Sequence, residues 1–217
     1  FNLAPRFNAA HLISHERTIE QIVLKGPRGV GVIPGSSGIP ELATLTEPML
    51  GALIDGIATL ERTVDTLIID MPGGLDRQSL FFLLAADRVL VVTTDDITAM
   101  TDAYAVIKTI FTQRPQACVA LIVNRARSQE SGLETYQKVA HVTRKFLGRE
   151  LALAGIVPFD EMVERSVAER VPVVIGHPES PAARAVTMIG ARLEVSPVSV
   201  PGRQPFSARF RALVSGR

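Results

Sequence analysis

The sequence predicts an α/β fold in which helices cover both faces of a mostly parallel sheet. Five short apolar runs alternate with segments long enough for helices, and each run ends in glycine, proline or polar residues. This alternation is typical of right-handed βαβ units. Hydrophobic residues make up 47% of the 217 residues but aromatic residues only 5%, which favours buried strands rich in Val, Ile and Leu.

The predicted elements follow directly from these runs, because a short apolar run bounded by turn residues predicts a buried strand. The runs place strands at residues 29–34, 64–70, 88–94, 118–124 and 151–158. The other segments place helices at residues 39–62, 78–84, 99–113, 133–147 and 162–170, the first interrupted at Pro48. Ligands of such sheets bind at the carboxyl ends of the strands, so the residues after each run are the candidates for function.

The end of the second run carries the clearest candidate. The sequence Ile-Ile-Asp-Met-Pro-Gly-Gly over residues 68–74 places the carboxylate of Asp70 at a strand end, before a glycine turn. A hard cation such as Mg²⁺ prefers oxygen ligands, so Asp70 could face a metal-bound phosphate. The alternative from the residues alone is that Asp70 only begins a turn before Pro72.

A phosphate-binding loop should accompany such an aspartate, and the sequence has none. No Gly-x-x-x-x-Gly-Lys-Ser/Thr segment occurs in the 217 residues. Residues 25–31 resemble such a loop superficially, but they lead into a predicted strand, whereas a phosphate loop follows a strand and opens a helix. We therefore predict a turn before the strand at this place.

Later strand ends carry polar and ring residues. Asn124 has an amide that can both donate to and accept from a base, and Pro158 and Phe159 end the last predicted strand. Asn and Pro are also common turn and strand-ending residues, so a purely structural role stays open at these positions. Asp95 and Asp96 precede a predicted helix, where the helix dipole favours acids.

Together, segments 35–38, 70–74, 93–96, 124–125 and 158–160 resemble the MinD/ParA class of deviant P-loop ATPases. Segments 34–38, 101–108, 123–125 and 155–160 resemble most of all its FlhG branch of flagellar-number regulators. The resemblance extends over about residues 3 to 190 and implies ATP and Mg²⁺ as cofactors. It also implies that residues 1–194 are an ATPase domain without its first strand, its P-loop and its second strand. Such a chain is expected neither to hydrolyse ATP nor to fold robustly alone, because it lacks phosphate-binding lysines and ladder partners for two strands.

The resemblance also assigns roles to individual residues. It implies that Asp70 holds magnesium through water as the switch II aspartate, and that Gly73 and Gly74 respond to the γ-phosphate. It places Asp102 near a nucleotide-dependent dimer interface. The residues that it implies for the nucleotide site are Asn124, Arg125, Pro158, Phe159 and Asp160.

The last part of the chain carries a separate signal. Residues 195–205 are rich in Pro, Ser and Val and predict a flexible linker, and residues 206–217 predict a basic amphipathic tail. In a helix, Phe206, Phe210 and Leu213 share one side, and these side chains with Arg209 and Arg211 are typical of a segment that lies in a membrane interface. A disordered basic tail is the alternative. No apolar stretch approaches the roughly 18 residues that a membrane span needs.

The leading hypothesis is a fragment of an FlhG-like ATPase that regulates flagellar number or placement through ATP-dependent dimerisation and membrane association. The implied partners are a second copy of the chain, a flagellar transcription activator or basal-body protein, and the inner membrane surface, with no direct contact to nucleic acid. The implied location is the cytoplasm, at the inner face of that membrane. The alternatives are a nucleotide-independent protein-binding module and a ParA-like ATPase of plasmid partition or cellulose synthesis.

Overall fold

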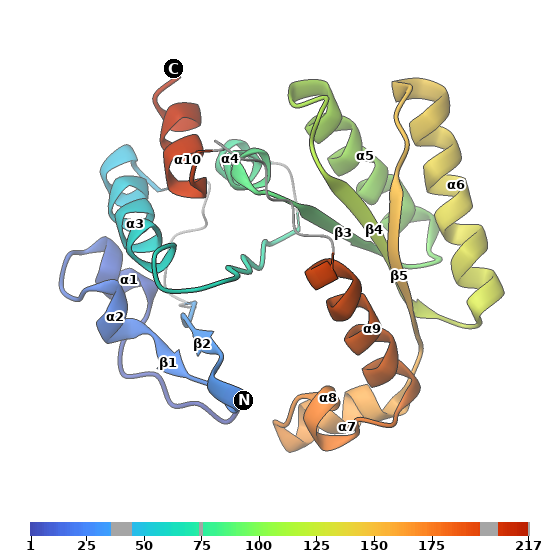
Figure 1. The fold of residues 1–217 in the computed structure, drawn as a ribbon, viewed down its shortest axis with the longest axis horizontal. Coiled ribbons are helices and arrows are strands. Elements are labelled where there is room, and N and C mark those ends of the chain that lie inside the picture. Colours follow the sequence, from blue (N-terminus) through green and yellow to red (C-terminus); the bar gives the residue numbers. More distant parts are fainter. Residues whose placement is uncertain (36–44, 74–75, 196–203, 217) are drawn as a thin grey trace. The chain divides into compact units, whose positions relative to one another are not determined.

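The computed structural model describes residues 1–35, 45–73, 76–195 and 204–216. The chain forms two compact units (Figure 1). The first consists of Phe1–Ala86 with Pro201–Arg217, and the second of Asp87–Val200. Each unit has its own secondary structure and is described by itself.

A parallel sheet forms the centre of the second unit. Its strands are β3 (Val89–Thr93), β4 (Val119–Ala126) and β5 (Ala152–Pro158), in that spatial order. Both ladders are parallel, with Val91 opposite Leu121 and Leu121 opposite Leu153. The three later predicted strands and the predicted α/β class are therefore confirmed.

Helices cover both faces of this sheet. The helices of the second unit are α5 (Ile97–Gln113), α6 (Gln129–Leu147), α7 (Glu161–Glu169), α8 (Val173–Gly176) and α9 (Pro181–Val195). A Cβ placed on Gly155 of β5 would lie 2.4 Å from Cγ1 of Ile189 on α9, and one placed on Gly132 of α6 would lie 2.4 Å from Cγ2 of Ile156. Because successive residues of a strand point to opposite faces, α9 and α6 lie on opposite sides of β5.

One strand of this sheet is only partly covered. Among the residues that the structure describes, β3 pairs with β4 and with no other strand. Leu90 and Val92 of β3 retain 38% and 57% of their accessible surface. A parallel sheet is normally buried on both faces. The exposed side chains of β3 are therefore unusual for a parallel sheet.

The first unit is mostly helical. Its elements are α1 (Ala9–Ile13), α2 (Ile19–Ile22), β1 (Leu24–Lys25), the 3₁₀ helix η1 (Pro27–Gly29), β2 (Gly31–Val32), α3 (Glu47–Leu60), α4 (Arg77–Ala85) and α10 (Phe206–Val214). Its main core joins α3, α4 and α10 through Ile54, Phe82 and Phe210, which are at most 4% exposed. The tail of the chain thus supplies part of this core.

Two predicted strands differ from the structure, both in the first unit. The run at 29–34 contains only β2, which pairs with β1 in an antiparallel hairpin and not in a parallel sheet. The N–H of Gly26 donates to the carbonyl of Val30 at 2.7 Å, and Arg28 and Gly29 have positive φ, so the predicted turn is confirmed.

The run at 64–70 forms no strand in the structure. Leu67, Ile69 and Met71 pack against the core of the first unit, whereas Ile68 and Asp70 are exposed. The alternation expected of a strand is therefore present. The described residues provide no neighbour that completes a ladder, and a ladder defines a strand.

Several helices begin earlier than predicted because polar residues cap them. Asp76, Asp96 and Ser128 cap α4, α5 and α6, each accepting from backbone N–H groups of the first turn. Pro48 lies in the first turn of α3, where proline is tolerated, so it does not interrupt that helix. Residues 36–44, which belong to the predicted helix 39–62, lie outside the described part of the chain.

Candidate functional site

A pocket of about 440 Å³ lies in the second unit. Its lining residues come from segments at or directly after the carboxyl ends of the three parallel strands: Thr94, Asp95, Arg125, Arg127 and Phe159. This is where open α/β sheets bind ligands, and the volume is within the range of small-molecule sites.

The end of β4 is irregular, and this irregularity shapes the pocket. The β4–β5 register shifts between Val123 and Ala126, and Arg125 has a φ of 56°. The side chain of Asn124 accepts the N–H of Arg125 at 3.0 Å. A left-handed conformation is uncommon for arginine, and here it turns the chain at the end of β4, as it does at Arg28 and Arg170 in a turn and at a helix end.

Arg125 and Phe159 form one wall of the pocket. The guanidinium carbon of Arg125 lies 5.5 Å from the centroid of the Phe159 ring, within the range of a cation–π contact. The N–H of Phe159 donates to the carbonyl of Ala126 at 2.9 Å, which fixes the loop after β5 beside the end of β4. Two planar groups from neighbouring loops are thereby held next to each other.

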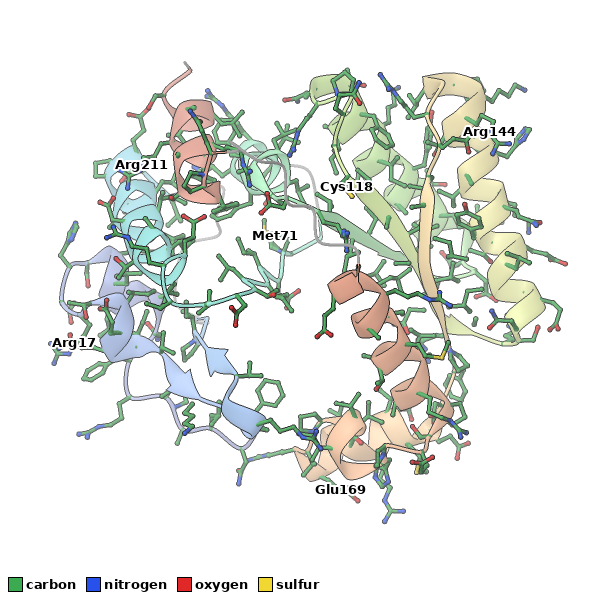
Figure 2. The ribbon with its side chains drawn as sticks, in the orientation of Figure 1. Arg17, Met71, Cys118, Arg144, Glu169 and Arg211 are labelled. Carbon is green, nitrogen blue, oxygen red and sulfur yellow. The ribbon has the colours of Figure 1, made fainter. Side chains whose placement is uncertain are left out.

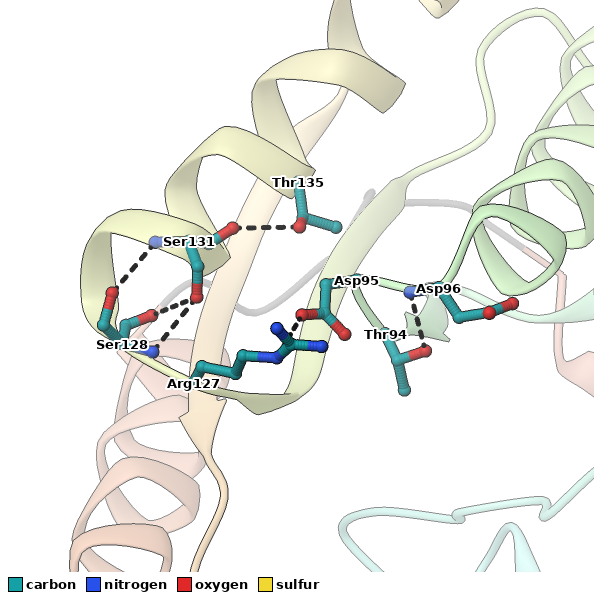
Figure 3. A network of polar contacts seen from close by, with 7 residues as sticks. All are labelled: Thr94, Asp95, Asp96, Arg127, Ser128, Ser131 and Thr135. Atoms are coloured by element: carbon teal, nitrogen blue, oxygen red, sulfur yellow. Dashed lines mark hydrogen bonds and ion pairs between the residues drawn. The ribbon is translucent and has the colours of Figure 1, made fainter.

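A charged pair joins two other loops of the pocket (Figure 3). Nε of Arg127, after β4, lies 3.3 Å from Oδ2 of Asp95, after β3. Next to Arg127, Ser128 and Ser131 exchange hydrogen bonds in a capping box that begins α6. The polar ends of the strands thus lead into helices with well-defined starts, which limits how far the pocket loops can move.

Asp160 has a structural role that the sequence does not reveal. Its Oδ1 accepts the N–H of Met162 at 2.9 Å, and its Oδ2 accepts the N–H of Ala182 at 3.0 Å. The bond from Ala182 is the main reason why the pKa of Asp160 lies below its ordinary value, and burial opposes it. This carboxylate therefore joins the starts of α7 and α9, and it is not among the described residues that line the pocket.

Two curated relatives share much of this chain. It is 29% identical over 196 residues to the antiactivator FleN of Pseudomonas aeruginosa, covering 90% of this chain and 70% of FleN. It is 28% identical over 172 residues to the flagellum site-determining protein YlxH of Helicobacter pylori, covering 78% and 58%. The chain thus spans between about three fifths and seven tenths of the length of these two relatives. No protein-family model matches it.

A solved structure gives the same fold. The septum site-determining protein MinD of Pyrococcus horikoshii, complexed with Mg-ADP, matches with a TM-score of 0.66 at 20% identity, covering 89% of this chain and 75% of MinD. These relatives and this structure support a MinD/ParA-type family of P-loop ATPases for the chain. Its sheet and helices are those of the MinD-like α/β fold.

Within this MinD/ParA-type chain, the predicted base-site residues are neighbours in space. Arg125 and Phe159 line the pocket. Asn124 is half-buried and accepts the N–H of Arg125, and Pro158 is the last residue of β5, opposite Ala126 of β4. No binding role was predicted for Thr94, Asp95 or Arg127, although each directly follows or lies near a strand end, and this position is the signal that would have found them.

The predicted switch residues lie in the first unit, and the predicted dimer residue lies in the second. Asp70 ends an extended segment and is exposed, as is Gly73, while Gly74 lies outside the described residues. An exposed carboxylate before a glycine fits a hydrated Mg²⁺, which keeps much of its water shell. No group of three or more His, Cys, Asp or Glu residues suited to a metal occurs in the described part of the chain. Asp102 is exposed on α5.

The predicted membrane segment is the helix α10, and its apolar side is buried in the first unit. Phe206 and Phe210 are 7% and 1% exposed, and Leu213 packs beside them. Glu61 accepts the N–H groups of Phe206 and Ser207 at 2.7 and 3.3 Å, so it caps α10 from α3. Any insertion of these aromatic rings into a membrane would first require α10 to leave this core.

The basic residues of α10 are also engaged. Arg211, labelled in Figure 2, belongs to α10. It forms an ion pair with Asp55 of α3, and Nε of Arg209 donates to the carbonyl of Ala85 at 2.8 Å. Across the described residues, no helix is both long enough and apolar enough to span a membrane.

Proposed function

We propose that this chain is part of a MinD-like ATPase that regulates the number or placement of flagella. The pocket at the ends of β3, β4 and β5 is the observation that carries this proposal, because it belongs to the fold that holds Mg-ADP in the MinD of Pyrococcus horikoshii. The flagellar role is supported by the relatives, an antiactivator and a flagellum site-determining protein.

In this proposal the nucleotide base occupies the pocket. Arg125 and Phe159 contact it, with Asn124 and Pro158 shaping the wall behind them. Asp160 acts indirectly, by fixing the loop that carries Phe159. Bound Mg²⁺ would supply the charge that the β- and γ-phosphates need, and the family resemblance implies that Asp70 would hold its water shell, with Gly73 and Gly74 as switch residues.

Hydrolysis needs more than these residues. A P-loop lysine neutralises phosphate charge, and none of the 217 residues belongs to such a loop. We therefore expect this chain to bind nucleotides weakly, through the base, and to hydrolyse none.

Dimerisation and membrane association complete the proposal. Asp102 would lie near an ATP-dependent interface between two copies, and the partner controlled would be a flagellar transcription activator or a basal-body protein. One tail such as α10 binds a membrane only marginally, whereas two tails on one dimer bind more tightly through effective concentration. Because Phe206 and Phe210 are buried, membrane binding in this scheme is coupled to the release of α10.

Titration calorimetry with Mg-ATP tests the nucleotide part of the proposal. It compares this chain with a version extended upstream to the next in-frame methionine. We expect tight binding and hydrolysis only in the extended version. There Asp70→Ala should abolish hydrolysis, whereas Asp65→Ala, an exposed carboxylate of the same segment, should not.

A second candidate is a protein-binding module that needs no nucleotide, which the missing phosphate loop favours. If neither version binds Mg-ATP, the ATPase proposal is wrong and this module becomes the better description.

A further inference from the structure

The surface that holds α10 has the contacts that a receptor for a helix needs. Phe81 and Phe82 of α4 contact the ring of Phe210, with centroids 6.2 and 4.5 Å away. Glu61, directly after α3, accepts N–H groups of the first turn of α10 at 2.7 and 3.3 Å. Apolar anchors and a cap for the helix start are how proteins hold an amphipathic helix. We refer to this surface, formed by Asp55, Glu61, Phe81 and Phe82, as the α3–α4 face.

The charge of α3 is opposite to that of the helix that lies on it. α3 contains Glu47 and Asp55 and no basic residue, and Glu61 follows it. α10 contains Arg209 and Arg211 and no acidic residue, and Arg211 pairs with Asp55. The α3–α4 face is therefore suited to a basic helix, and it repels a surface that is itself anionic.

The α3–α4 face would be uncovered whenever α10 left it. Ile54 and Phe82 are at most 4% exposed and belong to the core that α10 completes. Apolar side chains uncovered in this way mark an interaction site. An anionic membrane does not fit there, because Asp55 and Glu61 would lie against lipid charge of the same sign. A basic amphipathic helix does fit, since it brings apolar anchors together with the opposite charge.

We propose that the α3–α4 face binds a basic amphipathic helix of a partner protein, with aromatic residues one helical turn apart, whenever α10 leaves it. In the closed chain α10 is the internal competitor of that helix. This inference rests on the proposed release of α10 to the membrane and adds the surface at which a partner binds in that state. Partner binding and membrane binding thereby become coupled, because both need α10 to leave.

Fluorescence anisotropy with a labelled peptide of residues 204–216 tests this, because the peptide carries the contacts of α10. It is titrated with the full chain and with two variants that loosen α10. Phe210→Ala removes the central anchor, whereas Ala208→Gly with Ala212→Gly lowers helix propensity and keeps every anchor. We expect both variants to bind the peptide about tenfold more tightly than the unaltered chain, or better, because more of their α3–α4 face is free.

A charge exchange locates the peptide on the α3–α4 face. In the Phe210→Ala chain, the peptide with Arg211 should bind several-fold more tightly than one in which Arg211 is replaced by Glu, because Asp55 faces this position. Adding Asp55→Arg to the chain should reverse that order. Both peptides meet the same competing α10 in a given chain, so the ratio of their affinities reports the contact alone. Asp65→Arg, at an exposed position of the same unit, is the matched control and should leave the order unchanged.

Three results would overturn the inference. One is a peptide affinity that is the same for the unaltered chain and for both loosened variants. Another is an order of the two peptides that Asp55→Arg does not reverse, and the third is no binding to any of the chains. Sedimentation of the unaltered chain with anionic vesicles tests the membrane proposal separately. If the chain did not sediment, membrane association would be wrong, and the peptide titrations would still decide whether the α3–α4 face binds a helix.

Discussion

Gly155 determines how closely α9 packs on the sheet. A methyl group at this position would lie 2.4 Å from Cγ1 and 2.7 Å from Cδ1 of Ile189, so one of the two layers would have to move. We predict that Gly155→Ala lowers the free energy of unfolding by about 1–3 kcal/mol, the usual cost of overpacking. Urea unfolding followed by circular dichroism measures this.

Gly190→Ala is the matched control for this prediction, because a Cβ on Gly190 of α9 would meet nothing within 4 Å. Alanine is the better helix former, so this variant should equal the unaltered chain or exceed it by up to about 1 kcal/mol. Equal stability of the two alanine variants would show that α9 does not pack on β5 at this distance.

Asp160 gives the second unit a stability that depends on pH. Its pKa is lowered in the folded chain, chiefly by the N–H of Ala182, so the ionised form favours folding. This contribution is complete above the ordinary carboxyl pKa of about 4 and is lost as the pH falls through the lower folded value. We predict that Asp160→Asn is less stable than the unaltered chain at pH 7 and that the difference narrows below about pH 4.

Urea unfolding at a series of pH values from 7 to 3 provides the measurement. Asp65→Asn, the same exchange at an exposed position of the first unit, is the matched control. A difference for Asp160→Asn that stayed constant over the whole range would mean that its charge does not matter.

At the scale of elements, α10 joins the core of the first unit through Phe210. Its ring is 1% exposed and lies 4.5 Å from the ring of Phe82, between centroids. We predict that Phe210→Ala lowers the free energy of unfolding of this unit by about 3–5 kcal/mol. Hydrogen exchange should show faster exchange in α3, α4 and α10. Arg211→Ala, which removes an exposed ion pair, should cost at most about 1 kcal/mol, and equal effects of the two would contradict the packing of α10.

The cap on α10 leads to a second prediction for this element. Glu61→Ala leaves the N–H groups of Phe206 and Ser207 without their acceptor, which weakens the attachment of α10. If α10 is a membrane segment, sedimentation with anionic vesicles should increase in this variant and fall again with added salt. The double variant with Phe210→Ala should lose this gain. Unchanged sedimentation of Glu61→Ala would argue against membrane binding by α10.

For the whole molecule, the absence of a phosphate-binding loop from the sequence determines which ligands should raise its stability. A ligand that binds only the folded chain raises the melting temperature according to its concentration and affinity. We predict that millimolar ADP raises the melting temperature and that pyrophosphate at the same concentration does not, because the sequence offers a base pocket but no phosphate loop. If pyrophosphate raised the melting temperature as much as ADP does, the ligand would be bound through its phosphates at an anion site and not through its base in the pocket.

Much of the second unit could be predicted from the sequence, because local patterns specify it. The apolar runs of β3, β4 and β5 are long enough to be predicted as strands. In the helices between them, apolar residues recur with the period of a helix. Their starts were missed because Asp96, Ser128 and Asp160 act through side-chain bonds to the next turn, which apolar periodicity does not record.

The first unit was harder to predict because its structure depends on distant contacts. The strand-like run at 64–70 has the right alternation, but a strand forms only where a partner exists. The burial of α10 joins Phe206 to residues more than a hundred positions away, such as Glu61. For the site, the family motifs predicted Arg125 and Phe159, whereas the Asp95–Arg127 pair follows only from the arrangement of two neighbouring strands.

Within the described residues of the second unit, one edge of β3 has no partner strand, and this edge should influence how the protein behaves in concentrated solution. The strand has the sequence Val-Leu-Val-Val-Thr, without proline or charge, and Val92 keeps 57% of its surface exposed. Natural sheets usually protect such edges, because an unprotected one is a template for strands of other molecules. Copies of this chain should therefore associate through β3 and precipitate as their concentration rises. A lysine in place of Val92 should keep them in solution, which light scattering over a concentration series would reveal.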